Sequence, residues 1–269
     1  MPLLKTPAIT LKSRKWGEAD RIVTFYTLRF GKLRGVARGA RRIKSRFGSA
    51  LEPFVYCDLN LFEKHGDPLF RVTQADIRET FPALREDLAL MAGAARMVNL
   101  VAAVTAEGDA GPRIFETLLS GLRALQVGGE AGLTTILFQI TLLGQTGFRP
   151  QTDHCAACGA SFEPGRPAGS RRFSAMSGGL VCTSCAGRYP DRCLPMSAGT
   201  LAFIRQALRW APTVANRLKA TGQVRAELEA VVESFVTIVA GKRLPPVDFL
   251  AAEGRPPAYR TSRSRQASL

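Results

Sequence analysis

The chain has 269 residues, 46% hydrophobic and 22% charged, which excludes a mostly disordered protein and suits one large or two modest globular domains. Its longest apolar stretch, residues 133–144, has about half of the ~20 residues that cross a bilayer, so we expect no membrane span. A formal net charge of +15 favours a polyanionic partner, because lysine and arginine displace condensed counterions from a phosphate backbone.

The first 80 residues alternate apolar and polar side chains between turn residues, as β-strands do. The pattern predicts five strands, at residues 9–13, 22–28, 32–38, 54–62 and 69–77. In the third, Leu33, Gly35 and Ala37 share one face, and the opposite face is largely basic. We therefore expect residues 1–80 to form a small barrel of the partly open OB type, with an SH3-like barrel as the alternative.

Positive charge is concentrated in the barrel segment. No acidic residue occurs between Asp20 and Glu52, while nine basic residues do: Arg21, Arg29, Lys32, Arg34, Arg38, Arg41, Arg42, Lys44 and Arg46. A solvated charged face is the alternative explanation. Nine cations without a compensating carboxylate in the segment would repel one another, however, so the segment favours a nucleic-acid partner.

From residue 81 the apolar period becomes helical, so the predicted fold class is α+β. The pattern predicts helices over residues 84–104, 115–125, 133–143, 201–208 and 224–238. The third is apolar nearly all round and should be central, and Ser197 is a plausible N-cap for the fourth. The helical domain should span residues 81–250, followed by a disordered basic tail, residues 251–269.

Four cysteines form two C-x-x-C pairs separated by 23 residues: Cys155, Cys158, Cys182 and Cys185. This spacing predicts a structural Zn²⁺ site with a closed shell of four sulfurs, in a module of residues 150–195 inserted into the helical domain. His154 is an alternative ligand, and thiol redox chemistry at one pair is an alternative function. A zinc deaminase is excluded because no H-x-E motif is present. The separate Cys57 and Cys193 should be packed thiols.

Other catalytic patterns are missing from the sequence. It has two histidines, no G-x-S-x-G and no P-loop motif, so we expect a protein that is not an enzyme. Tryptophans such as Trp16 and Trp210 are more often packing residues than stacking platforms. Of the two, Trp16, flanked by basic residues, is the better candidate for stacking on a base. Phe25 and Tyr26 are consecutive in a strand, so at most one of them could stack on a base.

Several short segments, in this order along the chain, resemble the RecO family of bacterial recombination mediators. They are residues 11–21, 31–33, 39–45, 51–54, 61–66 and 147–150, followed by Cys155 and Cys158. The resemblance covers nearly the whole chain. The cysteine module occurs in only some members of the family.

The resemblance implies a protein that binds single- and double-stranded DNA and anneals complementary strands. With its partner RecR, it would help to load the strand-exchange recombinase onto DNA coated by single-strand-binding protein, in association with the nucleoid. A cytoplasmic location is expected from the sequence itself, because its first residues show no secretory signal. The resemblance also implies that a pocket in the helical domain captures the C-terminal tail of single-strand-binding protein. DNA contacts are expected on the barrel, at Lys12, Arg14, Lys15, Arg34, Arg38, Arg41, Arg42, Lys44 and Arg46.

A second hypothesis, from zinc and basic charge together, is a zinc-dependent DNA-binding transcription regulator. It predicts a strong preference among duplex sequences. No predicted helix carries a set of arginine, asparagine and glutamine suited to reading base edges, so we favour it less.

Overall fold

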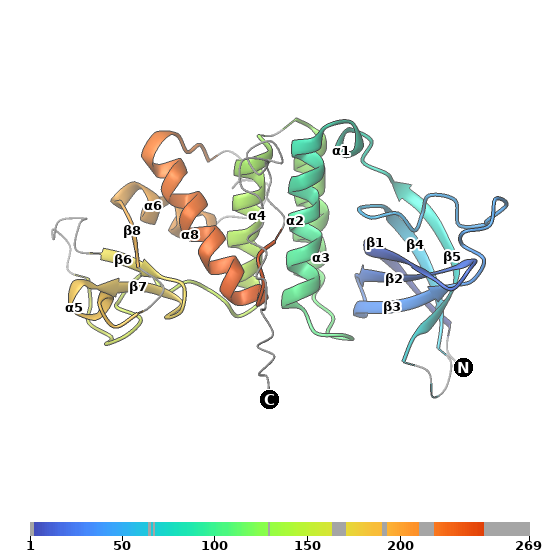
Figure 1. The fold of residues 1–269 in the computed structure, drawn as a ribbon, viewed down its shortest axis with the longest axis horizontal. Coiled ribbons are helices and arrows are strands. Elements are labelled where there is room, and N and C mark those ends of the chain that lie inside the picture. Colours follow the sequence, from blue (N-terminus) through green and yellow to red (C-terminus); the bar gives the residue numbers. More distant parts are fainter. Residues whose placement is uncertain are drawn as a thin grey trace, which may run out of the picture.

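A β-barrel and a helical domain lie side by side in the computed structural model (Figure 1), which describes residues 3–63, 66, 68–128, 130–162, 171–189, 193–209 and 218–244. The expected basic tail and Trp210 lie outside the described residues. The cysteine module projects from the side of the helical domain that faces away from the barrel (Figure 1).

Five strands build the barrel: β1 (Leu3–Trp16), β2 (Asp20–Thr27), β3 (Gly31–Ala37), β4 (Tyr56–Phe62) and β5 (Phe70–Glu79). Their order is β1-β2-β3-β5-β4, and antiparallel pairing of β4 with β1 closes the barrel. The seam between β3 and β5 is parallel and has only two residue pairs, Gly35 with Phe70 and Val36 with Arg71. The structure therefore confirms the five-stranded OB-like barrel, which is closed, though narrowly, where a partly open one was expected.

The interior of the barrel follows the predicted alternation. Along β3, Leu33, Gly35 and Ala37 are buried, while the residues between them are half-buried and face outward. Phe25 lies in the barrel core, and Tyr26, on the opposite face of β2, is equally buried against the helical domain. Neither aromatic ring is therefore free to stack on a base.

The helical domain contains α1 (Ala83–Glu86), α2 (Leu88–Val104), α3 (Pro112–Gln126), α4 (Ala131–Gln145), α6 (Ala198–Ala207) and α8 (Gly222–Ala240). α4 is buried along most of its length, which confirms its predicted central position. The single helix expected over residues 84–104 is wrong in one respect. Asp87 is extended and breaks it, because its carboxylate accepts hydrogen bonds from the backbone N–H groups of Ala89 and Leu90 and caps α2.

Ser197 is the N-cap of α6, as predicted, and its hydroxyl accepts a hydrogen bond from the backbone N–H of Thr200. Glu227 of α8 completes this cap by accepting hydrogen bonds from Ser197 N at 2.8 Å and Thr200 Oγ1 at 2.6 Å. Burial opposes ionisation of Glu227, but these hydrogen bonds outweigh it and lower its pKa to about 2. The carboxylate therefore fastens α8 to the start of α6.

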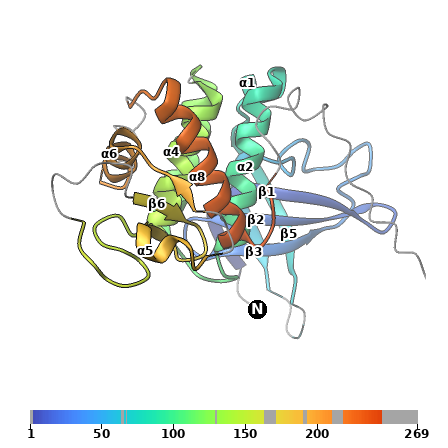
Figure 2. The ribbon, with the colours of Figure 1, turned by 60° about the vertical axis from the view of Figure 1, so that its left-hand side comes forward.

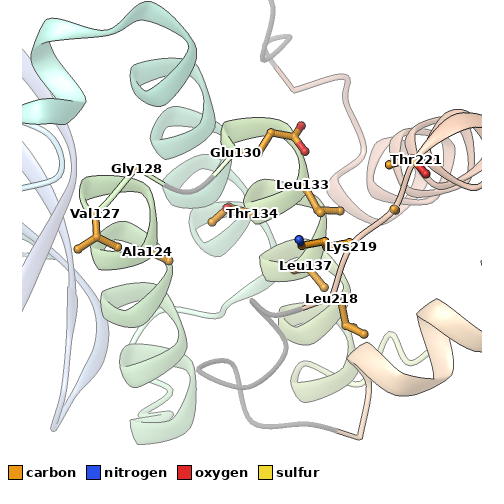
Figure 3. Close-up of a pocket in the computed structure, with 11 residues that line it drawn as sticks. Ala124, Val127, Gly128, Glu130, Leu133, Thr134, Leu137, Leu218, Lys219 and Thr221 are labelled. Atoms are coloured by element: carbon orange, nitrogen blue, oxygen red, sulfur yellow. The ribbon is translucent and has the colours of Figure 1, made fainter.

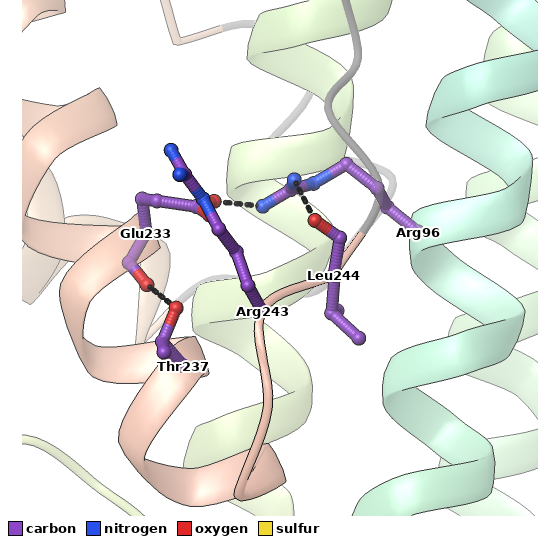
Figure 4. Close-up of polar contacts among 5 residues, drawn as sticks. All are labelled: Arg96, Glu233, Thr237, Arg243 and Leu244. Atoms are coloured by element: carbon purple, nitrogen blue, oxygen red, sulfur yellow. Dashed lines mark hydrogen bonds and ion pairs between the residues drawn. The ribbon is translucent and has the colours of Figure 1, made fainter. Parts of the chain in front are cut away.

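The end of α8 is anchored to α2 through a buried guanidinium (Figure 4). Gly241 ends the helix in the left-handed conformation, with φ 66°, and the chain turns back along α2. Arg96 of α2 then pairs with Glu233 and donates to the carbonyl oxygen of Leu244 at 3.4 Å. Arg243 reaches the same carboxylate at 3.3 Å. Because Arg96 is only 5% exposed, this pairing is well shielded from solvent.

The two domains are joined at the turn between β2 and β3. The Lys32 ammonium donates hydrogen bonds to the carbonyl oxygens of Ala102 and Thr105 at the C-terminal end of α2, where the helix dipole favours a cation. Beside it, Gly31 has φ 62° and lies so close to the next domain that a Cβ atom would fall 1.9 Å from the carbonyl oxygen of Asp109. The barrel is thus packed directly on backbone of the helical domain.

Candidate nucleic-acid interface and metal centre

The basic connection between β3 and β4, residues 38–55, begins at the end of the barrel farthest from the helices and runs back toward the helical domain, where Arg85 donates to the carbonyl oxygen of Pro53 (Figure 2). This connection is tied to the β1–β2 turn. The Arg41 guanidinium donates to the carbonyl oxygens of Gly17 at 3.2 Å and Glu18 at 2.8 Å. The carboxylate of Asp20 accepts a hydrogen bond from Gly39 N at 2.8 Å. Two loops far apart in sequence therefore form one surface, which we call the barrel tip: residues 14–20 and 38–46.

Other predicted contact residues lie on the outer face of the adjoining strands. The register places Lys12 opposite Thr24 and Thr24 opposite Arg34, so the two cations flank one polar residue across three strands. Arg14 lies two residues further along the same face of β1, and Lys15 is exposed at the tip. The nine predicted residues therefore occupy one strand face and the loops that adjoin it. Their role in binding remains a prediction.

Three of the nine basic residues between Asp20 and Glu52 have partners elsewhere in the fold, outside the barrel tip, which their sequence segment did not indicate. Arg21 pairs with Glu52 at 3.1 Å, and Arg34 reaches Glu107 of the helical domain at 3.5 Å. Lys32 is taken up by the carbonyl oxygens of α2. The other cations of the segment are exposed, and none pairs with a carboxylate of the described chain: Arg29, Arg38, Arg41, Arg42, Lys44 and Arg46.

Lys242, just after α8, is a basic residue that sequence reasoning missed. The pKa of Lys12 is lowered by burial first and then by the positive charge of Lys242, which therefore lies near it. No signal in the sequence could reveal this proximity, because the two lysines are on opposite sides of the domain junction. Lys242 thus extends the basic strand face onto the helical domain.

The four cysteines converge in the inserted module, where the structure brings all four sulfurs within 4.8 Å of one another. Cys155 and Cys158 lie on a turn, Cys182 ends β7 (Gly179–Cys182) and Cys185 lies in α5 (Thr183–Ala186). β7 pairs with β6 (Arg171–Ser174), which also pairs with β8 (Leu194–Pro195). The Sγ atoms of Cys158 and Cys182 are 3.9 Å apart, close to the ~3.8 Å edge of a tetrahedron with metal–sulfur bonds of about 2.3 Å.

The electrostatics of the cluster also suit a cation. Burial opposes ionisation of Cys155, but backbone N–H groups, first that of Cys182, lower the pKa of this thiol to about 6. Hydrogen bonding to the sulfurs of Cys182 and Cys158 raises the pKa of Cys185 to about 12. A positive ion bound between the sulfurs would favour ionisation of Cys155 and Cys185 side by side. The residues present fit a metal ion held by four thiolates.

The remaining candidates lie apart from this cluster. The ring of His154 contacts the Gln151 side chain at 2.9 Å and is not among the grouped ligand atoms. Cys193 packs beside the cluster as a buried thiol, and Cys57 lies in the barrel core. Burial raises the pKa of Cys57 to about 12. Both are packed thiols, as expected.

A pocket of about 600 Å³ opens between the end of α3, the start of α4 and residues 218–221 (Figure 3). Its apolar lining includes Val127, Leu133, Leu137 and Leu218. Lys219 extends across it toward α4 and supplies a positive charge (Figure 3). Glu130 also lines the pocket, but its carboxylate pairs with Arg225 at 2.7 Å, so Lys219 and the apolar lining together suit a ligand that is both hydrophobic and acidic.

Together these features define an OB-barrel protein whose helical domain carries an inserted four-cysteine module. The models of the N-terminal and C-terminal domains of recombination protein O match residues 1–81 and 85–246. In the described part of the chain, no helix has the length and apolar character to cross a membrane.

Individual relatives agree with the domain matches. The chain is 32% identical over 250 residues to DNA repair protein RecO of Desulforamulus reducens, covering 93% of this chain and 94% of the relative. It is 38% identical over 205 residues to DNA repair protein RecO of Geobacter sulfurreducens, covering 76% and 80%. It is 35% identical over 248 residues to DNA repair protein RecO of Myxococcus xanthus, covering 92% of this chain and 96% of the relative. The chain therefore belongs to the RecO family, and its role lies in DNA repair and recombination.

Proposed function

We propose that the protein is a non-catalytic mediator that binds single- and double-stranded DNA through its barrel and anneals complementary strands. With RecR, it would help to load the strand-exchange recombinase onto DNA coated by single-strand-binding protein, on the nucleoid in the cytoplasm. The observation that carries this proposal is the set of exposed cations on and beside the barrel tip that have no carboxylate partner among the described residues. Such a surface attracts phosphate backbones with little regard to base sequence.

Charge reversal at the barrel tip tests the proposal. Arg41, Arg42 and Lys44 should be replaced together by glutamate, and binding and annealing of fluorescent oligonucleotides measured across a salt titration. We expect loss of both activities, with the fold intact by circular dichroism, and for the wild type a steep fall in affinity with salt. A matched control replaces three exposed arginines of the helical domain and module, Arg149, Arg188 and Arg209.

An equal loss in the control variant would show that net charge matters and the barrel tip does not. Unchanged affinity of the barrel variant near 150 mM salt would overturn the proposal. A strong preference for one duplex sequence would instead favour a zinc-dependent transcription regulator.

We also propose that the pocket of the helical domain receives the acidic and hydrophobic C-terminal tail of single-strand-binding protein. Leu133 and Leu137 would contact the apolar part of the tail, and Lys219 its carboxylates. Fluorescence anisotropy with a labelled tail peptide tests this. Lys219→Glu should abolish peptide binding and leave binding of bare DNA unchanged, whereas Lys242→Glu should leave peptide binding unchanged. The reverse pattern would exclude the pocket.

The metal ion held by the four cysteines is, we propose, Zn²⁺ in a structural role. A borderline-soft ion without redox chemistry suits four thiolates, and a shell closed by four sulfurs leaves no coordination position for a reacting water. Metal analysis of the purified protein should give one zinc per chain. Another metal at that stoichiometry would correct the identity of the ion.

A further inference from the structure

Two large apolar side chains are exposed at the barrel tip, among its cations. Trp16 is the last residue of β1 and is 56% exposed, and Ile43 is fully exposed in the basic connection. Contact with an apolar ligand would remove this exposed apolar area from water, which is favourable in proportion to the area covered. Their position calls for an apolar ligand that arrives together with negative charge.

The backbone of the tip holds these two segments in a defined arrangement. The carbonyl oxygen of Gly17, which follows Trp16, accepts a hydrogen bond from the Arg41 guanidinium. Arg41 in turn precedes Ile43 by two residues. Arg41 N also donates to the carbonyl oxygen of Ala19 at 2.9 Å. The connection and the turn are therefore fixed to each other before any ligand binds, which reduces the ordering cost of binding.

The cations that surround the apolar pair indicate the chemistry of the ligand. Arg14 and Lys15 precede Trp16, and Arg42 and Lys44 flank Ile43, and all four are exposed. A nucleic acid strand offers phosphates to such cations, and its bases offer flat apolar faces only when they are unpaired. In a duplex those faces are stacked inside and unavailable to a side chain at the surface.

We propose that Trp16 and Ile43 contact unpaired bases, so that the barrel tip holds a single strand through its bases as well as its phosphates and thereby prefers single-stranded over double-stranded DNA. This inference rests on the proposed DNA binding and adds to it a preference for single-stranded over double-stranded DNA. Because base pairing removes the faces that the two side chains contact, a strand that has annealed is released from them. The apolar pair therefore promotes release of the duplex product.

An oligonucleotide without bases separates the two kinds of contact. A thymine oligomer and an abasic oligomer of equal length carry the same phosphate charge, so the ratio of their affinities measures the base contacts alone. For the wild type we expect the thymine oligomer to bind about tenfold more tightly, since stacking on an aromatic side chain contributes ~1–3 kcal/mol per base. In Trp16→Ala combined with Ile43→Ala the ratio should approach one, with binding of the abasic oligomer and of duplex unchanged.

Three further variants make the result specific. Trp16→Phe keeps a stacking ring and should retain most of the ratio, whereas Ile77→Ala removes another exposed isoleucine of the barrel and should leave it unchanged. In Trp210→Phe, Trp16 is the only remaining tryptophan, and its fluorescence should be quenched by the thymine oligomer and not by the abasic one. Equal affinities of the wild type for both oligomers would overturn this inference and leave the proposed function standing. If the wild type bound neither, the proposed function itself would fail.

Discussion

Gly31 gives the sharpest test of how the barrel is joined to the helical domain. Its φ of 62° costs alanine about 1–2 kcal/mol in the left-handed region. A Cβ atom would also fall 1.9 Å from the carbonyl oxygen of Asp109, and backbone cannot rotate away as a side chain can. The loop of residues 105–111 would have to withdraw, which breaks the hydrogen bond that the neighbouring Lys32 donates to the carbonyl oxygen of Thr105.

The expected cost follows from these contacts. A hydrogen bond to a charged group contributes about 1.5–3 kcal/mol, and the one that Lys32 donates to Thr105 would be lost, which together with the backbone cost gives a total loss of ~3–5 kcal/mol for Gly31→Ala. Gly108→Ala is the matched control. Gly108 lies in the same junction with φ 76°, but nothing lies within 4 Å of its added Cβ, so only the backbone cost of ~1–2 kcal/mol applies.

Urea unfolding of the two variants, followed by circular dichroism, measures the difference. With a slope of ~2–3 kcal/mol per molar urea, the midpoint of Gly31→Ala should lie about 1 M below that of Gly108→Ala. Equal midpoints would refute the reasoning, because they would mean that the close approach of Gly31 to Asp109 contributes nothing. Limited proteolysis in the 105–111 loop of Gly31→Ala supplies a second readout, since withdrawal of the loop exposes its backbone.

Three further predictions concern the cysteines and one carboxylate. Cys158→Ala should remove the metal and destabilise the module while sparing DNA binding by the barrel. Cys193→Ala, the control, should keep one metal per chain. Metal retained in Cys158→Ala would contradict the assigned ligands. Glu227→Gln should lose about 1 kcal/mol of stability at pH 7, allowing for solvent screening, and the difference should fade as pH falls from 4.5 toward 2, because the folded pKa is the lower one; a difference constant with pH would contradict this. Cys57 should resist thiol reagents at pH 8 until the barrel unfolds, as followed by mass spectrometry, because burial raises its pKa to about 12.

Features that repeat over short stretches were predictable from the sequence. Every second residue of β3 is buried, and α4 is buried on all sides. Both burial patterns repeat along the chain, so the spacing of the apolar residues reveals them. The four cysteines were predictable for a different reason, because two-residue spacers present paired sulfurs to one ion whatever the surrounding fold. These patterns predicted the barrel, the helical region and the convergence of the four cysteines.

Contacts between distant segments could not be predicted. The ion pair of Arg34 with Glu107 and the nearness of Lys12 to Lys242 depend on how the barrel docks on the helices, which no local pattern encodes. At Asp87 the chain could either continue one helix or end it and cap the next, α2. The apolar residues have nearly the same spacing in both cases, so their periodicity does not distinguish them. The pocket likewise combines residues 124–137 with residues 218–221.

The apolar interior is divided into separate clusters, and this division determines which parts of the protein lose stability together. The barrel interior shares no residue with the core of the helical domain, whereas Phe173 and Leu180 of the cysteine module belong to that second core. Phe173 packs edge-on to Phe235 of α8 with ring centroids 5.6 Å apart. The module and the helices thus share one apolar core, to which the outer face of the barrel also contributes Ile9, Tyr26 and Tyr56, while the barrel interior forms a separate cluster. If the module binds the proposed metal ion, withholding that ion would weaken the shared core and the pocket of the helical domain first, while the barrel interior, which lies outside that core, would keep its own contacts.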